Sequence, residues 1–89
     1  MFSMYSLYIL KHSVTKEIYI GKTSNLKRRF GQHNFGNQVS TRRKNGEWKI
    51  VYVEIYKSKS DADMRELKLK QHGSSKHELL KRIKSSLGD

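Results

Sequence analysis

Residues 19–33 read YIGKTSNLKRRFGQH, and they contain the end of a strand, a tight turn and the start of a helix. From residue 18 to Gly21, apolar and other residues alternate with the period of a half-buried strand. The glycine marks where the strand ends or where another part of the chain comes close to its backbone. Residues 23–25 are three good N-caps in a row, so a helix is expected to begin at once.

The expected helix places two kinds of side chain on neighbouring faces. Leu26 and Phe30 are four residues apart and share the face that packs on the sheet. Arg29 and His33 have the same spacing and share the adjacent face. A guanidinium and an imidazole are thereby brought toward the end of the preceding strand.

The composition limits both the size of the fold and the kind of partner. The chain has 89 residues and no internal repeat, enough for one small domain, residues 1–89, with a modest core. It carries 19 Lys and Arg against 8 acidic residues, a formal charge of +11. This excess favours a polyanion, nucleic acid before an anionic membrane, over the simpler alternative of charge that only keeps the protein soluble.

The same composition excludes several classes of protein. No cysteine is present, so disulfides and thiolate zinc sites are excluded. The first residues have neither the basic region nor the apolar run of a signal peptide, and no membrane span is visible. We therefore expect a cytoplasmic protein without a membrane partner, a monomer or a weak dimer.

Periodicity and turn residues predict the order strand, strand, helix, strand, helix, helix. The strands are expected over residues 4–11, 17–22 and 48–56, the helices over residues 24–33, 61–71 and 77–87, and a long basic loop over residues 34–46. Gly73 should end the second helix, and Ser75 with Glu78 should form a capping box that opens the third. The third strand is apolar on both faces, which suggests a central position. The order indicates an α+β layered architecture.

The first two strands should form a hairpin, and its loop length decides where two tyrosines point. With an even number of loop residues and no bulge, Tyr8 and Tyr19 lie on the same face of the sheet. An odd number would put them on opposite faces.

Glu66 is the acidic residue that we single out. On the second helix it falls within an apolar arc formed by Ala62, Leu67 and Leu69, so it should face the sheet. A buried carboxylate needs a partner, either a metal ion or a cation such as Arg29 or Lys22. The other acids are more consistent with caps or solvated charges: Glu17, Glu54, Asp61, Asp63 and Glu78.

These side chains suit the hydrolysis of a phosphodiester. Glu66 could hold one loosely bound Mg²⁺, and the planar guanidinium of Arg29 suits a phosphate. Tyr8 or Tyr19 could accept a proton only if nearby cations or a metal lower its pKa from about 10; otherwise each is an aromatic that fills the core. His33 could bind phosphate or shuttle a proton, or simply cap the helix.

Taken together, these residues resemble the GIY-YIG nuclease family, over roughly residues 5–70. The resemblance rests on Ser6-Leu7-Tyr8, on Tyr19-Ile20-Gly21 eleven residues after Tyr8, and on Lys22, Arg29, His33, Ala62 and Glu66. It is strongest to the stand-alone, single-domain bacterial members. It implies a small three-stranded antiparallel sheet flanked by three helices, in the order ββαβαα.

The resemblance also implies an activity, a cofactor and a site. The expected activity is divalent-metal-dependent endonuclease cleavage of DNA, with RNA as the other candidate substrate and Mg²⁺ or Mn²⁺ on Glu66. Tyr8, Tyr19, Arg29 and His33 are the other catalytic candidates. The basic residues expected to bind substrate are Lys22, Lys27, Arg28, Arg42 and Arg43.

Two positions depart from the family pattern. Ser6 replaces the first glycine, and no asparagine follows Asn45, whereas the family often carries one near the site. Ser74, Ser75 or a water are candidates to take its place. Two alternatives therefore stand beside the nuclease: a basic nucleic-acid-binding module that cuts poorly or not at all, and a structural RNA-associated protein. Without a separate recognition domain, we expect weak or structure-directed specificity.

Overall fold

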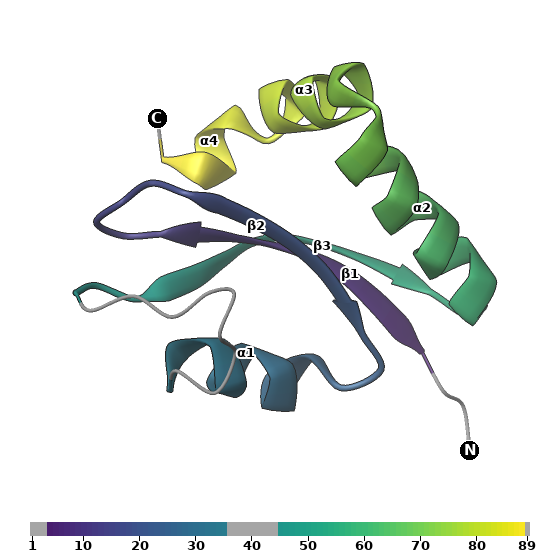
Figure 1. Cartoon of the computed structure of the whole chain (residues 1–89), viewed down its shortest axis with the longest axis horizontal. Helices are drawn as coiled ribbons and strands as arrows, with labels where there is room; N and C mark the ends of the chain where they lie inside the picture. Colours follow the sequence, from purple (N-terminus) through teal and green to yellow (C-terminus); the bar gives the residue numbers. More distant parts are fainter. Residues whose placement is uncertain (1–3, 36–44, 89) are drawn as a thin grey trace.

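The computed structural model describes residues 4–35 and 45–88, in which three antiparallel strands form one sheet with helices on both sides (Figure 1). The strands are β1 (Tyr5–His12), β2 (Ile18–Thr23) and β3 (Trp48–Tyr56). The helices are α1 (Leu26–Asn34), α2 (Lys59–Gln71), α3 (Gly73–Arg82) and a single turn, α4 (Lys84–Leu87). The α+β architecture and the antiparallel three-stranded sheet are confirmed.

The strand order is β2-β1-β3, so β1 is central and β3 lies at an edge. The expectation that β3 is central was therefore wrong. Strand β1 has four consecutive buried residues, Leu7 to Leu10, because it has a neighbour on each side and helices on each face. Strand β3 is apolar on both sides because helices pack against both of its faces, yet Ile55 remains 65% exposed.

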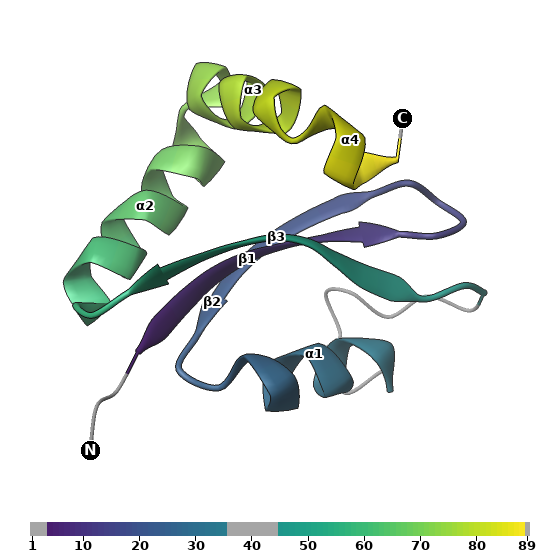
Figure 2. The same ribbon diagram turned by 180° about the vertical axis from the view of Figure 1, so that it is seen from behind.

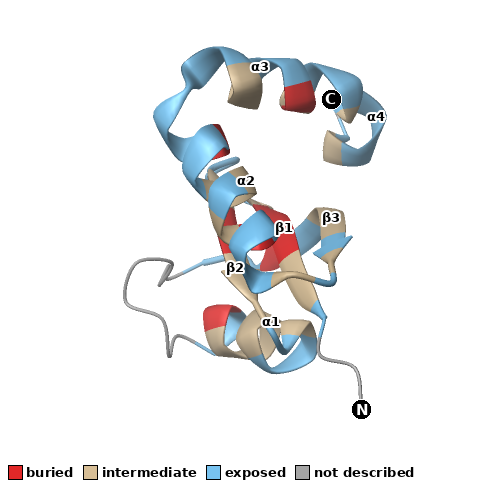
Figure 3. Cartoon of the chain, turned by 90° about the vertical axis from the view of Figure 1, so that its right-hand side faces the viewer, coloured by how far each residue is buried: buried red, intermediate tan, exposed pale blue. Residues whose placement is uncertain are grey.

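Two cores lie on opposite faces of the sheet (Figure 2). The face under α2, α3 and α4 is aliphatic, and its buried members are Leu7, Ile9, Ile20, Leu69 and Leu79. The face under α1 is aromatic, and its buried members are Tyr8, Leu10 and Trp48, with Tyr19, Leu26 and Phe30 packed against them. Figure 3 shows the buried residues concentrated on β1 between these helices. The predicted packing of Leu26 and Phe30 is confirmed.

The start of α1 follows the prediction closely. Asn25 is the N-cap, and its side-chain oxygen accepts a hydrogen bond of 3.1 Å from the backbone N–H of Arg28. At the other end, the Asn34 side chain pairs with the backbone of Trp48. Its Oδ1 accepts from the Trp48 N–H at 2.7 Å, and its Nδ2 donates to the Trp48 carbonyl at 3.0 Å. The end of α1 is thus tied to the start of β3.

The β1–β3 ladder shifts by one residue after Ile9, and Val51 is the extra residue of this β-bulge. Because side chains alternate along a strand, the shift moves every preceding β3 residue to the other face. Trp48 therefore lies on the face that carries Tyr8, where its ring is 5.1 Å from that of His12. The bulge supplies the aromatic face with its largest side chain.

The C-terminal helices differ from the prediction. His72 ends α2 and directly precedes α3, so Gly73 begins a helix instead of ending one, and the expected capping box is not the helix start. The expected single last helix is broken at Ile83, whose backbone (φ −106°, ψ 26°) leaves the helical region. The break lets α4 turn back over β3, where the Leu87 carbonyl accepts a hydrogen bond from Lys11 at 2.9 Å.

Candidate active site at the edge of the sheet

The two tyrosines of the hairpin lie on the same face of the sheet, beneath α1. Tyr8 pairs with Gly21 and Leu10 pairs with Tyr19 across the β1–β2 ladder, the register that an even loop produces. Their ring centroids are 6.3 Å apart. The prediction for an even loop is confirmed.

Gly21 is the point at which the Tyr8 ring crosses the edge strand. A Cβ built on Gly21 would lie 2.5 Å from the Tyr8 hydroxyl oxygen, 2.6 Å from its Cζ and 2.9 Å from Cε1 of Tyr19. No side chain fits there without moving a phenol. The glycine therefore serves close approach of another group, one of the two roles expected for it.

His33 completes an aromatic cluster with the two tyrosines. It is 2% exposed, its Nε2 lies 2.8 Å from the Tyr8 hydroxyl, and its ring centroid is 4.8 Å from that of Tyr19. Burial lowers the pKa of His33, and the positive charge of Arg29 lowers it further. A neutral imidazole can accept the hydroxyl hydrogen of Tyr8, so His33 is a buried partner of the phenol and not a surface histidine.

The environment of Tyr8 acts against the phenolate. Burial is the main cause that raises the pKa of Tyr8, the charge of Tyr19 and Glu66 adds to it, and Arg29 only partly opposes it. The sequence argument asked for a pKa lowered by nearby cations or a metal, and Arg29 alone does not lower that of Tyr8. A proton acceptor next to Tyr8 is needed instead, and His33 lies in that position.

Arg29 carries a donor that nothing nearby satisfies. Its Nε is buried and has no hydrogen-bond partner among the residues that the structure describes. A buried donor without a partner costs free energy, and natural proteins rarely keep one without a reason. A phosphate oxygen would satisfy such a group, because guanidinium–phosphate bonds are charge-assisted.

Glu66 reaches this edge of the sheet from α2, which packs most closely on β2 and β1. Its side chain is 17% exposed, with Oε1 3.5 Å from Lys22 Nζ and Oε2 3.3 Å from Lys70 Nζ. The expected lysine partner is present, and the carboxylate is half-buried where burial was expected. The apolar arc is narrower than predicted, because Leu67 is 46% exposed.

The protein ligands at Glu66 fit a loosely held Mg²⁺ or Mn²⁺ ion and do not fit a tightly bound metal. Charge-assisted hydrogen bonds are usually about 2.7–2.9 Å long, so neither carboxylate oxygen is taken by a short bond. Within residues 4–35 and 45–88 no group of three His, Cys, Asp or Glu could hold a metal ion. A cation on Glu66 would therefore keep waters or substrate oxygens as most of its ligands.

The expected substrate-binding residues are spread over two sides of the fold. Lys22 lies on the aliphatic side, opposite Leu7, and its Nζ is 2.6 Å from Asp63. Lys27 and Arg28 are exposed on α1 beside a shallow groove of about 430 Å³. The predictions for Arg42 and Arg43 fall outside the described residues.

Two acidic residues that were expected to be caps or solvated charges are instead held by ion pairs or hydrogen bonds. The Glu54 carboxylate accepts hydrogen bonds from Arg65 at 2.9 Å, from the Tyr52 hydroxyl at 2.7 Å and from the Tyr56 hydroxyl at 2.5 Å. The signal was present, because these two tyrosines flank Glu54 at the spacing that shares one strand face.

Asp63 is the second acid that was missed. It binds Lys22 at 2.6 Å and Lys59 at 2.9 Å. Its signal was the i,i+4 spacing to Lys59 together with its place one turn before Glu66.

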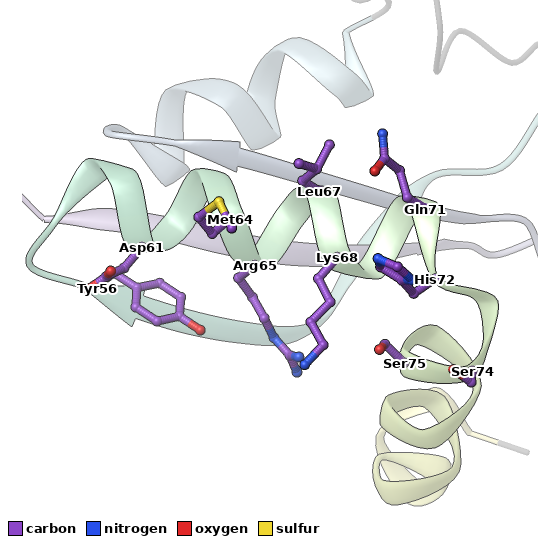
Figure 4. A pocket seen from close by; sticks show the side chains of 10 residues that line it. All are labelled: Tyr56, Asp61, Met64, Arg65, Leu67, Lys68, Gln71, His72, Ser74 and Ser75. Atoms are coloured by element: carbon purple, nitrogen blue, oxygen red, sulfur yellow. The ribbon is translucent and has the colours of Figure 1, made fainter.

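The two serines considered as substitutes for the late asparagine lie elsewhere. Ser74 and Ser75 line a groove of about 570 Å³ together with Arg65 and Lys68 (Figure 4). This groove is bordered by α2 and the start of α3, which cover the aliphatic face. The tyrosines lie on the other face.

The fold and this set of side chains agree with a domain of the nuclease class. A model of the family described as the GIY-YIG catalytic domain matches residues 4–84. The chain belongs to the GIY-YIG family.

Its relatives include UPF0213 proteins of bacteria. A UPF0213 protein of Clostridium perfringens is 37% identical over 65 residues, which are 73% of this chain and 69% of that protein. The solution NMR structure of a UPF0213 protein from Bacillus halodurans is similar with a TM-score of 0.57 at 27% identity. The match covers 91% of this chain and 85% of that one. These matches agree with the expected resemblance to stand-alone members of the family.

No helix in the described part of the chain has both the length and the apolar character needed to cross a membrane.

Proposed function

We propose that the protein is a divalent-metal-dependent endonuclease that hydrolyses DNA phosphodiester bonds with weak or structure-directed specificity. The observation that carries this proposal is the buried 2.8 Å contact between Tyr8 and His33, beside the unsatisfied Nε of Arg29. The net charge of +11 supports a nucleic-acid substrate.

The chemistry assigns a separate role to each group. Arg29 binds the scissile phosphate and neutralises charge that develops on it. Tyr8 accepts a proton from the attacking water while its own proton passes to Nε2 of His33, so the phenol never carries a full negative charge. Burial keeps the Tyr8 phenol protonated and the His33 imidazole neutral, so each group begins the relay in the protonation state that it needs. When bound at Glu66, a divalent ion supplies a Lewis acid for the phosphate oxygens.

A second function, a basic nucleic-acid-binding module on the same scaffold, has one observation in its favour. Both oxygens of Glu66 already face an ammonium, from Lys22 and from Lys70. If neither ammonium yields to a metal, the protein binds DNA or RNA without turnover, with an affinity that falls steeply with salt.

Nicking of supercoiled plasmid in Mg²⁺ or Mn²⁺ separates the two. We expect the wild type to nick and Glu66→Gln to lose about 100-fold or more in rate, since a metal ion contributes several kcal/mol to such a reaction. Glu78→Gln, an exposed acid on α3, is the matched control and should cut like the wild type. Equal cutting by Glu66→Gln removes that residue from the mechanism.

Two further measurements complete the test. A wild type that binds DNA but cuts no form of it, with or without metal, favours the binding module. Cut sites mapped on branched, nicked and linear duplexes test the specificity, and confinement to one short sequence contradicts our proposal.

A further inference from the structure

Asp63 and Glu66 lie one turn apart on α2 and share one lysine from the edge strand. Lys22 Nζ is 2.6 Å from Asp63 Oδ1 and 3.5 Å from Glu66 Oε1. The side chains of Lys22, Asp63 and Glu66 are 36%, 34% and 17% exposed, so they lie at the border between solvent and the sheet edge. Lys22 thus has two acids within reach and binds only one of them closely.

Lysines at both ends extend this arrangement into a row of alternating charge. Lys59 Nζ is 2.9 Å from Asp63 Oδ2, and Lys70 Nζ is 3.3 Å from Glu66 Oε2. Both oxygens of Asp63 therefore take short bonds, whereas within residues 4–35 and 45–88 both oxygens of Glu66 have only the longer contacts to Lys22 and Lys70. The pKa of Lys22 agrees with this preference for Asp63, because the hydrogen bond to Asp63 is the largest cause that raises it.

The asymmetry has a consequence for any cation that approaches Glu66. Lys22 follows Gly21 on a paired strand, so its backbone position is held by the β1–β2 ladder and only its flexible stem can move. Without the charge of Asp63, the remaining attraction draws the ammonium to Glu66. There it competes with a metal for the same carboxylate.

We propose that Asp63 is a positioning residue that holds the Lys22 ammonium off Glu66 and so keeps that carboxylate open to a divalent cation. The inference rests on the proposed function, because it gives Glu66 the metal-binding role. Asp63 itself binds no metal and touches no substrate. It acts through Lys22.

Mn²⁺ titrations followed by NMR test this on the full chain without DNA. Paramagnetic broadening of the backbone amide signals around Gly21 and Glu66 reports binding at this edge of the sheet, and its loss in Glu66→Gln assigns the binding to this carboxylate. Asp63→Asn should weaken the apparent Mn²⁺ affinity about five- to tenfold. Lys22 would then pair with Glu66, and displacing one partly exposed ion pair has a cost of this size. Asp61→Asn, which removes the same charge from an exposed position on α2, is the control and should have little effect.

Lys22→Met supplies the decisive comparison. This variant removes the competing ammonium, so it should bind Mn²⁺ about as well as the wild type or better. Adding Asp63→Asn to Lys22→Met should then change little. If Asp63→Asn weakens binding by the same factor with and without Lys22, Asp63 acts only through its own charge and the proposal is overturned. The same holds if Asp63→Asn alone binds like the wild type.

The Glu66→Gln variant distinguishes this failure from failure of the proposed function. If Mn²⁺ broadens the amide signals of Glu66→Gln as it does those of the wild type, the metal role of Glu66 fails and the inference fails with it. If broadening is lost in Glu66→Gln and unchanged in Asp63→Asn, the metal role stands and only the role of Asp63 is wrong.

Discussion

Two polar sites on opposite faces of the sheet, the network around Glu54 and the Arg29 guanidinium, differ in how far their hydrogen bonds are satisfied. On the aliphatic face Glu54 takes hydrogen bonds from Arg65, Tyr52 and Tyr56. Burial alone would raise the pKa of Glu54, but these bonds outweigh it and the pKa is lowered. On the aromatic face Arg29 Nε and His12 Nε2 are buried without a hydrogen-bond partner in the described residues.

This difference separates a hydrogen-bonded network that stabilises the fold from a buried donor that a ligand could satisfy. A satisfied network holds its elements in one arrangement, here β3 against α2 through Glu54 and Arg65. An unmet buried donor such as Arg29 Nε lowers stability and is kept where a ligand can satisfy it. Variants on the two faces should therefore differ in whether they lose activity or stability.

The largest effect is expected on the aromatic face, from Gly21→Ala. The added Cβ would lie 2.5 Å from the Tyr8 hydroxyl, so the phenol must move. Displacement of a reacting group by about 1 Å can cost roughly 100-fold in rate, which plasmid nicking would measure. In the control Gly31→Ala, the Cβ meets only Phe35, at 3.8 Å, among the residues that the structure describes, and activity should be retained. Full activity in Gly21→Ala would show that the position of Tyr8 is unimportant.

The next effect belongs to the aliphatic face. Glu54→Gln leaves the Arg65 guanidinium without its counter-ion in a partly buried site, where the two side chains are 16% and 25% exposed. We expect the free energy of unfolding to fall by about 2 kcal/mol, a shift in Tm of roughly 10 °C. Nicking per folded molecule should not change. If activity falls more than stability, the division between the two faces is not real.

The smallest effect concerns the pH dependence of stability. The pKa of His33 is lowered in the folded state from its ordinary 6.5, so below that pH the unfolded chain takes up a proton that the folded chain resists. This contribution to stability is complete above pH 6.5 and is lost as the pH falls through the folded pKa. In urea titrations between pH 7.5 and 5, the free energy of unfolding should fall less steeply with decreasing pH in His33→Gln than in the wild type.

A control accompanies the pH measurement. His77→Gln, exposed on α3, should leave the acid loss unchanged. Acid slopes that are the same in the wild type and in both variants would mean that His33 is not held neutral by its buried position.

Local rules predicted the part of the fold that local rules govern. A helix start within residues 23–25 and the packing of Leu26 follow from spacing over a few residues, and the structure confirms them. The shared face of Tyr8 and Tyr19 was expected only for an even loop, and the structure has the register of such a loop. The position of β3 in the sheet was missed, because an edge strand with helices on both faces has the same apolar pattern as a central one.

What remained hidden depends on partners far away in the sequence. The bulge at Val51, the break at Ile83 and the bond from Arg65 to Glu54 arise from packing between elements, and no window of neighbouring residues records them. At the site, residue types indicated the chemistry, but only the structure joins Tyr8 to His33. The roles of these residues in catalysis stay predictions.

The two hydrogen bonds between Asn34 and Trp48 have a consequence for how this scaffold can vary. They close residues 35–47 at their base, so chain added there begins and ends at points already held together. Doubling such a loop costs only about 0.6 kcal/mol in closure entropy. Insertions of new sequence at this place would thus reach a nucleic acid from a fixed anchor, and the domain could gain recognition elements without disturbing its hairpin.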